Sequence, residues 1–356
     1  MNALIPFIGV RDGESKTVEQ IEKEIRKVAA KLLADNKVDV VVGYEDGTLP
    51  CQAVPSFIET PEDADRLVWN SFCAVNPAKY VHDIIFRHRE SQKRAKPEDR
   101  TKKVVGVVAR GCTTRSIVLH LQEKQYDGDQ VVIIGVPCRG FVSRKRLSHA
   151  VGGKEILGAV QKGDTLSVET SDGTEDIPIG DVLAANCLTC RFNNPVMSDI
   201  LIGDPAPAMD EDSEYNEVDE FENLTEEDRW SYFKKEMAKC MKCYACRNTC
   251  PSCYCKICFV EQSQPNWVGV GVDEPDTQVF QIMRIFHMAG RCVDCGSCSE
   301  VCPMGVDLRK FLKKLDKDAY SLFAYRTGES LDNAPPLSVH AAEDKEDFIF
   351  EPETSR

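Results

Sequence analysis

The sequence predicts an α/β domain with a mainly parallel sheet, followed by a small all-α domain. In the first half of the 356 residues, apolar runs of strand length alternate with helical patterns, whereas two matching cysteine runs lie among helical patterns near the C-terminus. A chain of this length can bury two modest hydrophobic cores. We place the domains at 1–204 and 229–320, joined by an acidic linker at 205–228 and followed by a tail at 321–356.

The N-terminal domain is expected to alternate helices and strands. Apolar residues at helical spacing predict a first helix over 18–32, and three apolar runs predict buried strands at 38–42, 103–109 and 130–136. The helical pattern between the last two strands, over 113–125, completes a β-α-β unit. Because the strands of such a unit run in the same direction, the sheet should be largely parallel.

Cysteines follow two of these strands at their carboxyl ends. Cys112 comes shortly after the second predicted strand, and Cys138 follows the third. Ligands gather at this edge of open α/β sheets. Together with Cys187 and Cys190, these residues make a four-thiolate set, called the third set below, that could hold a cubane cluster. On spacing alone, the four cysteines could equally be small buried hydrophobic residues.

The segment between the domains is strongly acidic. It holds eleven Asp or Glu residues over 210–228 and no Lys or Arg, which is typical of a solvated linker, with a docking surface as the alternative. The formal net charge of −14 argues against nucleic acid as a ligand, since nucleic-acid binding uses a basic surface.

Two cysteine runs of one form dominate the C-terminal domain. Both have the spacing C-x-x-C-x-x-C-x-x-x-C-P, at 240–251 and 292–303. This spacing is typical of two-cluster [4Fe-4S] ferredoxins, in which the fourth cysteine of each run crosses to the other cluster. We therefore predict a first set, Cys240, Cys243, Cys246 and Cys302, and a second set, Cys292, Cys295, Cys298 and Cys250. A zinc ribbon is the alternative, because C-x-x-C pairs also bind zinc.

Helices are predicted on either side of both runs. Thr225 can cap a helix that leads to Cys240, Pro275 opens a second helix that ends near Gly290, and a third helix begins near Val306. The domain is therefore expected to consist of helices around two clusters.

Three further cysteines, Cys253, Cys255 and Cys258, follow the first run directly. They could hold a fourth metal site, as a cluster or a zinc ion, or tune the neighbouring cluster through S–H contacts. Three local thiols need a fourth ligand from elsewhere, for which Cys51 and Cys73 are candidates. Both are otherwise expected to be core residues.

The seventeen cysteines of the chain exceed what core packing requires. The N-terminus lacks the pattern of a secretory signal peptide, and no apolar stretch is long enough for a membrane helix. We therefore expect a cytoplasmic protein, without membrane insertion, whose reduced thiols are free to bind metal.

The segment over 103–204 resembles the beta-subunit family of deazaflavin-reducing hydrogenases and formate dehydrogenases. The resemblance rests on three motifs, Gly135-Val136-Pro137-Cys138, Cys187-Leu188-Thr189-Cys190-Arg191-Phe192 and Ser198-Asp199-Ile200-Leu201-Ile202-Gly203-Asp204. That family carries a cluster in this domain, which implies that the third set, Cys112, Cys138, Cys187 and Cys190, holds it. Members also bind FAD, so flavin phosphate contacts are expected among four basic residues, Arg110, Arg115, Arg139 and Arg144. A solvated basic face is the alternative for these arginines.

The segment over 224–315 resembles the small iron-sulfur subunit of heterodisulfide reductases and the ferredoxin-like half of formate dehydrogenase beta subunits. Together the two resemblances imply an electron-transfer subunit of a cytoplasmic redox complex. Its partners would be a formate dehydrogenase or hydrogenase catalytic subunit, or a heterodisulfide-reductase-like flavoprotein. Two alternatives stay open: an FAD-dependent oxidoreductase of a soluble hydride carrier, either a deazaflavin or NAD(P)H, and a zinc-stabilised interaction module.

Overall fold

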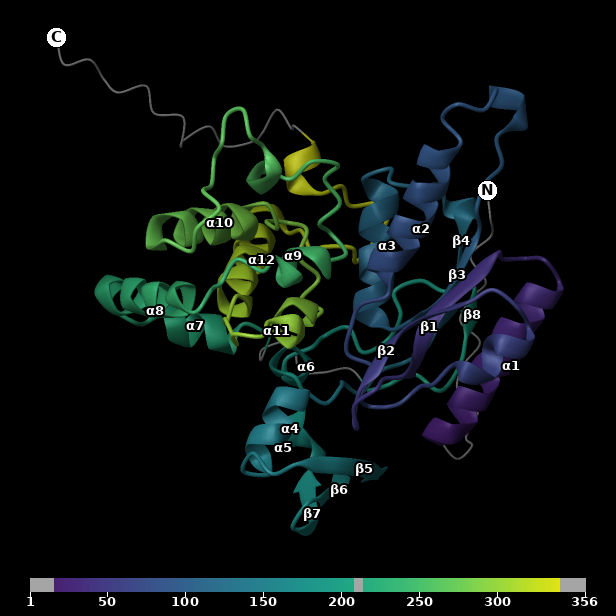
Figure 1. The fold of residues 1–356 in the computed structure, drawn as a ribbon, viewed down its shortest axis with the longest axis horizontal. Coiled ribbons are helices and arrows are strands. Elements are labelled where there is room, and N and C mark those ends of the chain that lie inside the picture. The colour runs from purple at the N-terminus through teal and green to yellow at the C-terminus, as the bar shows by residue number, and fades with distance from the viewer. Residues whose placement is uncertain (1–15, 208–213, 340–356) are drawn as a thin grey trace.

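The computed structural model describes residues 16–207 and 214–339. A mixed α/β part and a helical part lie against each other, with α3 and α6 of the first part closest to the second (Figure 1). The mixed α/β fold expected from the sequence is thereby confirmed. Within the described residues, no helix combines the length and the apolar character needed to cross a bilayer.

The α/β part is built on a five-stranded sheet of order β2-β1-β3-β4-β8. All neighbours pair in parallel except the edge strand β2, which is antiparallel to β1. The strands are β1 Val40–Asp46, β2 Ala53–Ile58, β3 Val105–Ala109, β4 Val131–Gly135 and β8 Ile200–Leu201. The three predicted strands thus correspond to β1, β3 and β4.

Both faces of this sheet are covered, because successive side chains of a strand point to opposite faces. Val41 and Val108 belong to the core beneath α1 (Val18–Ala34). Val42 and Val107 belong to the core shared with α2 (Ala78–Ser91) and α3 (Gly111–Gln122). The strands are therefore buried on both sides, which explains their continuous apolar sequences.

A second sheet, which the sequence analysis did not predict, lies after β4. Its antiparallel strands are β5 Ile156–Lys162, β6 Thr165–Thr170 and β7 Gly173–Pro178. Leu166 and Val168 of β6 pack with Leu147 in a separate small core. The short helices beside this sheet are α4 Arg144–Ala150, α5 Ile179–Val182 and α6 Ala185–Leu188.

The C-terminal part contains helices and no strand over its described residues 214–339. Its core includes Phe233, Met237, Phe280 and Leu312. The helices are α7 Asn216–Glu222, α8 Glu226–Ala238, α9 Ala245–Asn248, α10 Glu274–Phe286, α11 Ser297–Val301 and α12 Arg309–Phe323. The Thr225 hydroxyl accepts a hydrogen bond from the Asp228 backbone N–H at 3.1 Å, so the predicted cap of α8 is present. Single 3-10 turns complete the structure at Glu62–Arg66, Pro97–Asp99, Gly128–Gln130, Phe259–Glu261 and Pro336–Ser338.

The acidic segment differs from the solvated linker that its composition predicts. Residues 208–213 lie outside the described residues, but the following part folds as α7 and packs against α12. Glu214 is only 5% exposed and pairs with Lys313 and Arg326. The basic residues that neutralise the segment come from α12 and from Arg326 shortly after it, about a hundred positions later, so local composition did not reveal them.

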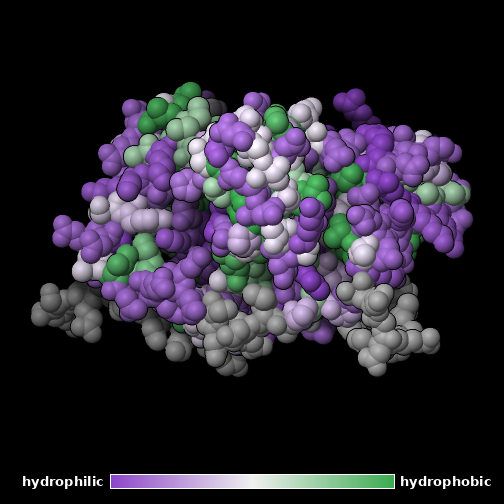
Figure 2. Space-filling view, turned by 90° about the horizontal axis from the view of Figure 1, so that it is seen from below, coloured by the Kyte–Doolittle hydropathy of each residue, from purple (hydrophilic) through white to green (hydrophobic). Residues whose placement is uncertain are grey.

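The described part of the predicted tail also packs on the α/β part. The Arg115 Nε–H of α3 donates to the Thr327 carbonyl oxygen at 2.8 Å, and Gln122 donates to the Ser330 carbonyl oxygen at 2.7 Å. Seen from below, the surface is mostly hydrophilic, with small separate hydrophobic areas (Figure 2).

Candidate iron-sulfur sites

The two cysteine runs fold into the same loop conformation. Lys242 and Asp294 occupy equivalent positions between the first two cysteines of each run, and both have φ of 50°. Two positions later, Tyr244 and Gly296 have φ of 60° and 73°. Non-glycine residues seldom adopt positive φ, so a repeated pair of such residues marks a specific loop. Each loop leads into a short helix, α9 or α11, and these two helices pack together.

The first set combines residues from both runs. Cys246 is buried. Cys240 of its own run and Cys302 of the other run lie close enough for their charges to affect its pKa, and residues related in this way are called electrostatic neighbours below. The Gln281 side-chain N–H donates to the Cys240 sulfur at 3.1 Å, and the Val306 backbone N–H lies 3.4 Å from the Cys302 sulfur. Cys243 is exposed to solvent. The fold thus brings the fourth cysteine of the second run beside the first.

The second set lines one small cavity together with Arg284 and Met288 of the α10 end. The four thiols around it are Cys250, Cys292, Cys295 and Cys298. Burial raises the pKa of Cys250 to about 12 and that of Cys298 to about 11, although the nearby Arg284 charge lowers both. Free thiols are therefore kept protonated here, and a positively charged metal centre would be needed to hold them as thiolates.

Cys112 and Cys138 of the third set follow the carboxyl ends of β3 and β4. The electrostatic neighbours of Cys112 include Cys138 and Cys190, and those of Cys187 include the same two residues. Gly111 permits this approach: a Cβ atom there would stand 1.9 Å from the Phe192 carbonyl oxygen. The segment that carries Cys190 can therefore pass directly against the start of α3.

A buried arginine accompanies the third set. Arg110 is 4% exposed, and its Nη2 donates to the Tyr44 hydroxyl at 3.0 Å and to the Ala74 carbonyl oxygen at 3.1 Å. Its Nε has no partner among the described residues. Burial raises the pKa of Cys112 to about 12, and the Arg110 charge opposes that rise. Among the described residues, no carboxylate forms an ion pair with this guanidinium, which provides positive charge beside Cys112, Cys138 and Cys187, where a cluster would be negative.

The three sets form a continuous series. Among the thiols that act on the pKa of Cys246 in the first set, Cys298 of the second set has the largest effect. Cys295 of the second set has the same position relative to Cys112 of the third set. The second set therefore lies between the other two.

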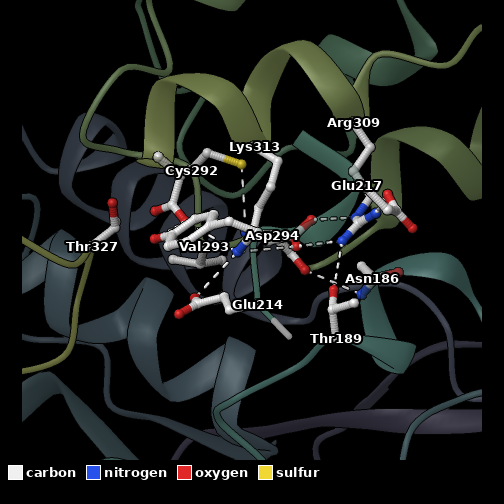
Figure 3. A network of polar contacts seen from close by, with 12 residues as sticks. Asn186, Thr189, Glu214, Glu217, Cys292, Val293, Asp294, Arg309, Lys313 and Thr327 are labelled. Carbon is white, nitrogen blue, oxygen red and sulfur yellow. Dashed lines mark hydrogen bonds and ion pairs between the residues drawn. The ribbon is translucent and has the colours of Figure 1, made fainter. Parts of the chain in front are cut away.

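A polar network fixes the second set against the α/β part (Figure 3). Asp294 is its centre: the Arg309 guanidinium donates to both carboxylate oxygens, at 2.9 and 3.2 Å, and Lys313 lies 3.7 Å away. The Asn186 side chain, next to Cys187, donates to the Asp294 carbonyl oxygen at 3.1 Å. The Asp294 backbone N–H in turn lies 3.4 Å from the Cys292 sulfur. One acidic residue thus connects the loops of the second and third sets.

The additional cysteines are only partly brought together. Cys253 has Cys258 and Cys255 as electrostatic neighbours, whereas Cys73 lies in the core beneath α1 and Cys51 packs against the core of the second sheet. Over residues 16–207 and 214–339, no three His, Cys, Asp or Glu side chains are grouped closely enough to hold a single metal ion. The fourth metal site stays a prediction.

The four arginines proposed for flavin phosphate differ in their exposure. Arg110 and Arg115 are buried and donate to protein oxygens, while Arg139 is exposed and Arg144 half-buried. A cavity of about 620 Å³ is lined by other basic residues, Lys145, Arg146, Arg309 and Lys310, together with acidic and apolar side chains.

The sequence analysis missed Arg284, Asp294 and Arg309. Arg284 falls on the buried stripe of α10 with Phe280 and Gln281. A charged residue at core spacing on an amphipathic helix is a signal that could have singled it out. Asp294 could not be recognised, because its partners come from α6 and α12.

An α/β fold with cysteine sets at the sheet edge and in repeated loops is typical of iron-sulfur redox subunits. No family model matches the chain. The chain is 25% identical over 365 residues to the F420-dependent formate dehydrogenase 1 subunit beta of Methanococcus maripaludis. This match covers 86% of this chain and 90% of that protein. Over 106 residues, it is 33% identical to the F420-dependent formate dehydrogenase subunit beta of Methanocaldococcus jannaschii. These relatives support the resemblance to the formate dehydrogenase beta-subunit family.

The extent of these matches differs. The match to the M. jannaschii protein covers 30% of this chain and spans 27% of that relative. A solved structure of the F420-reducing [NiFe] hydrogenase complex from Methanosarcina barkeri matches half of the chain and 64% of its own, with 16% identity and a TM-score of 0.36. A likeness this slight carries no argument about function.

Proposed function

We propose that the chain is an iron-sulfur electron-transfer subunit of a multi-subunit redox complex of the formate dehydrogenase or hydrogenase kind. It would hold [4Fe-4S] clusters in the first, second and third sets. The observation that carries this proposal is the series in which Cys246 neighbours Cys298, and Cys295 neighbours Cys112. Three adjoining clusters would carry electrons from the exposed Cys243 to the sheet edge, or the reverse.

Bound clusters would supply the one-electron chemistry, and the protein supplies position, hydrogen bonds and charge. Gln281 donates to the Cys240 sulfur, and the Gly140 backbone N–H lies 3.3 Å from the Cys138 sulfur. Asp294 and its basic partners hold the loop of the second set in place. Such fixed donors favour the charged, metal-bound thiolate over the protonated thiol.

The C-terminal helical part is, in this proposal, a dicluster ferredoxin domain like the small iron-sulfur subunit of heterodisulfide reductases. The repeated loop conformation around Lys242 and Asp294 supports it. The names of the relatives support a formate dehydrogenase as the complex, with a catalytic redox subunit as partner. The proposed location is the cytoplasm.

Anaerobic purification, with iron, sulfide, zinc and flavin counted per chain, tests the proposal. Three [4Fe-4S] clusters correspond to about twelve iron atoms and twelve sulfides per chain. The reduced protein should show the electron paramagnetic resonance (EPR) signals of interacting [4Fe-4S]⁺ clusters. A colourless protein that contains zinc, but neither iron nor labile sulfide, would establish the interaction module instead.

A second candidate function is an FAD-dependent oxidoreductase of a deazaflavin or NAD(P)H. The cavity of about 620 Å³ favours it, since this volume is in the range of small-molecule sites. Lys145 at its rim donates to the Cys302 carbonyl oxygen at 2.6 Å, so a flavin bound there would adjoin the first set. Flavin absorbance at one FAD per chain would support this function, and a chain with clusters alone would exclude it.

A further inference from the structure

Arg284 is a buried positive charge in the helical part. It lies near the end of α10 and is 4% exposed, on the face that also buries Phe280 and Ile285. A guanidinium stays protonated in proteins, so it cannot avoid the energetic cost of burial by losing its charge. Burying such a charge is costly unless a negative group and hydrogen-bond acceptors surround it.

Within the part of the chain that the structure describes, this guanidinium has one hydrogen-bond acceptor. Its Nη2 donates to the Cys246 carbonyl oxygen at 2.8 Å, whereas Nε and Nη1 are buried without a partner among the described residues. Arg309 is also buried, but its charge is compensated by ion pairs with the carboxylates of Asp294 and Glu217. Within residues 16–207 and 214–339, no carboxylate forms an ion pair with Arg284.

The surroundings of Arg284 are sulfur atoms from two different sets. Its electrostatic neighbours are Cys246 of the first set, Cys298 and Cys250 of the second, and Cys253. It also lines the cavity around which the second set is arranged. The missing counter-charge and the missing acceptors thus have the same location as the two predicted clusters.

We propose that Arg284 is the shared counter-charge of the clusters in the first and second sets, and that its free N–H groups donate hydrogen bonds to cluster sulfur. This inference rests on the proposed function. Reduction adds an electron to a cluster, and both a nearby positive charge and N–H···S bonds favour the more negative state. Arg284 therefore raises the reduction potentials of both clusters. Because one guanidinium acts on both, it shifts the two potentials in the same direction.

The test compares Arg284→Met and Arg284→Lys with the wild-type chain, purified anaerobically and titrated by EPR at controlled potential. Methionine fills a similar volume without charge, whereas lysine keeps the charge but loses the planar fork. Arg229→Met is the matched control, because Arg229 is on α8 and donates to the Glu222 carbonyl oxygen at 3.3 Å. The third cluster serves as an internal reference.

In Arg284→Met, both C-terminal clusters should become at least tenfold harder to reduce, a shift of about 59 mV for a one-electron couple. The third cluster should not shift, Arg284→Lys should lie in between, and Arg229→Met should match the wild type. Full iron content with unchanged potentials in Arg284→Met would overturn the inference.

If Arg284→Met does not take up iron, the inference is tested on the wild-type chain instead. Protein labelled with ¹⁵N in the arginine guanidinium should show a nitrogen hyperfine coupling to the reduced C-terminal clusters in pulsed EPR, and its absence would overturn the inference. A wild-type chain that lacks iron and sulfide would instead refute the proposed function, a different outcome from loaded clusters insensitive to Arg284.

Discussion

Arg309 donates two parallel hydrogen bonds to the Asp294 carboxylate, from Nε to Oδ1 at 2.9 Å and from Nη2 to Oδ2 at 3.2 Å. The pair joins α12 to the loop between Cys292 and Cys295, and a third contact from Arg309 Nη2 reaches the Thr189 hydroxyl at 3.0 Å. A buried bidentate pair of this kind fixes both position and orientation. The loop of the second set is thereby tied to the segment that carries Cys187 and Cys190.

Asp294→Asn should destabilise the protein by about 1.5 to 3 kcal/mol, the range for a hydrogen bond to a charged group. The amide keeps the shape of the side chain but leaves Arg309 and Lys313 short of a negative partner. Urea unfolding under anaerobic conditions measures the loss. Asp318→Asn is the control, since Asp318 pairs with Lys314 on the more exposed side of α12, the helix that carries Arg309 and Lys313. Equal stability of the two variants would contradict a structural role for Asp294.

Cys138→Ala should remove the cluster of the third set and leave the other two intact. The variant loses one thiolate from a set whose members come from separate segments, so no neighbouring residue can replace it. Iron per chain should fall by about four atoms, the content of one cubane. Cys51→Ala is the control: Cys51 packs against the core of the second sheet, and this variant should keep its full iron content. Unchanged iron in Cys138→Ala would show that the third site is incorrect.

Cys302→Ala should damage the cluster of the first set, although Cys302 belongs to the second run. The electrostatic contact between Cys302 and Cys246 leads to this expectation. Cys250→Ala is the reciprocal variant and should damage the cluster of the second set. EPR spectra of the two reduced variants, compared with the wild type, assign each loss. If Cys302→Ala disturbs only the second cluster, the crossed assignment fails.

Gly296→Ala should weaken the contact between the two parts of the chain. A Cβ atom at Gly296 would stand 2.2 Å from the Asn186 Oδ1, and φ there is +73°. Asn186 would have to move and lose its bond to the Asp294 carbonyl oxygen. Gly163→Ala is a matched control, with φ of +60° and open space around its Cβ position. We expect Gly296→Ala to lose about 1 to 3 kcal/mol more than this control in urea unfolding, and no difference would refute the steric argument.

His120 should make the stability of the protein depend on pH. Its buried ring has Nε2 2.8 Å from the Pro251 carbonyl oxygen, and burial lowers its pKa to about 3. In the unfolded chain the imidazole takes up a proton near pH 6.5, whereas in the folded chain it stays neutral at that pH. The contribution of His120 to the free energy of unfolding is therefore present above pH 6.5 and is lost as pH falls below it.

Between pH 7.5 and 5.5, the wild type should therefore lose about 1.4 kcal/mol more than His120→Gln, whose amide can still donate to Pro251 but does not titrate. Urea unfolding at both pH values gives the comparison. The same pH dependence in both proteins would show that His120 is not the group responsible.

The sequence predicted those parts of the fold whose patterns are local. The apolar runs that became β1, β3 and β4 and the capped start of α8 are each decided by a few neighbouring residues. The second sheet was missed because β5 buries only Ile156, and because β6 and β7 carry polar or charged residues beside their few apolar ones. The packing of the acidic segment was missed because Glu214 depends on Lys313 and Arg326, far along the chain.

By itself, the sequence determined the cysteine spacing, and with it the prediction of two cubane sites, because the reach of a short loop fixes which sulfur atoms can meet. Only the tertiary structure decided the order of the three sets and the charges around them. Cys295 meets Cys112, and Arg284 meets sulfur atoms of two sets, through contacts between residues that lie on separate elements of the chain. Local pattern carries no information about such contacts, since they arise only when separate elements pack together.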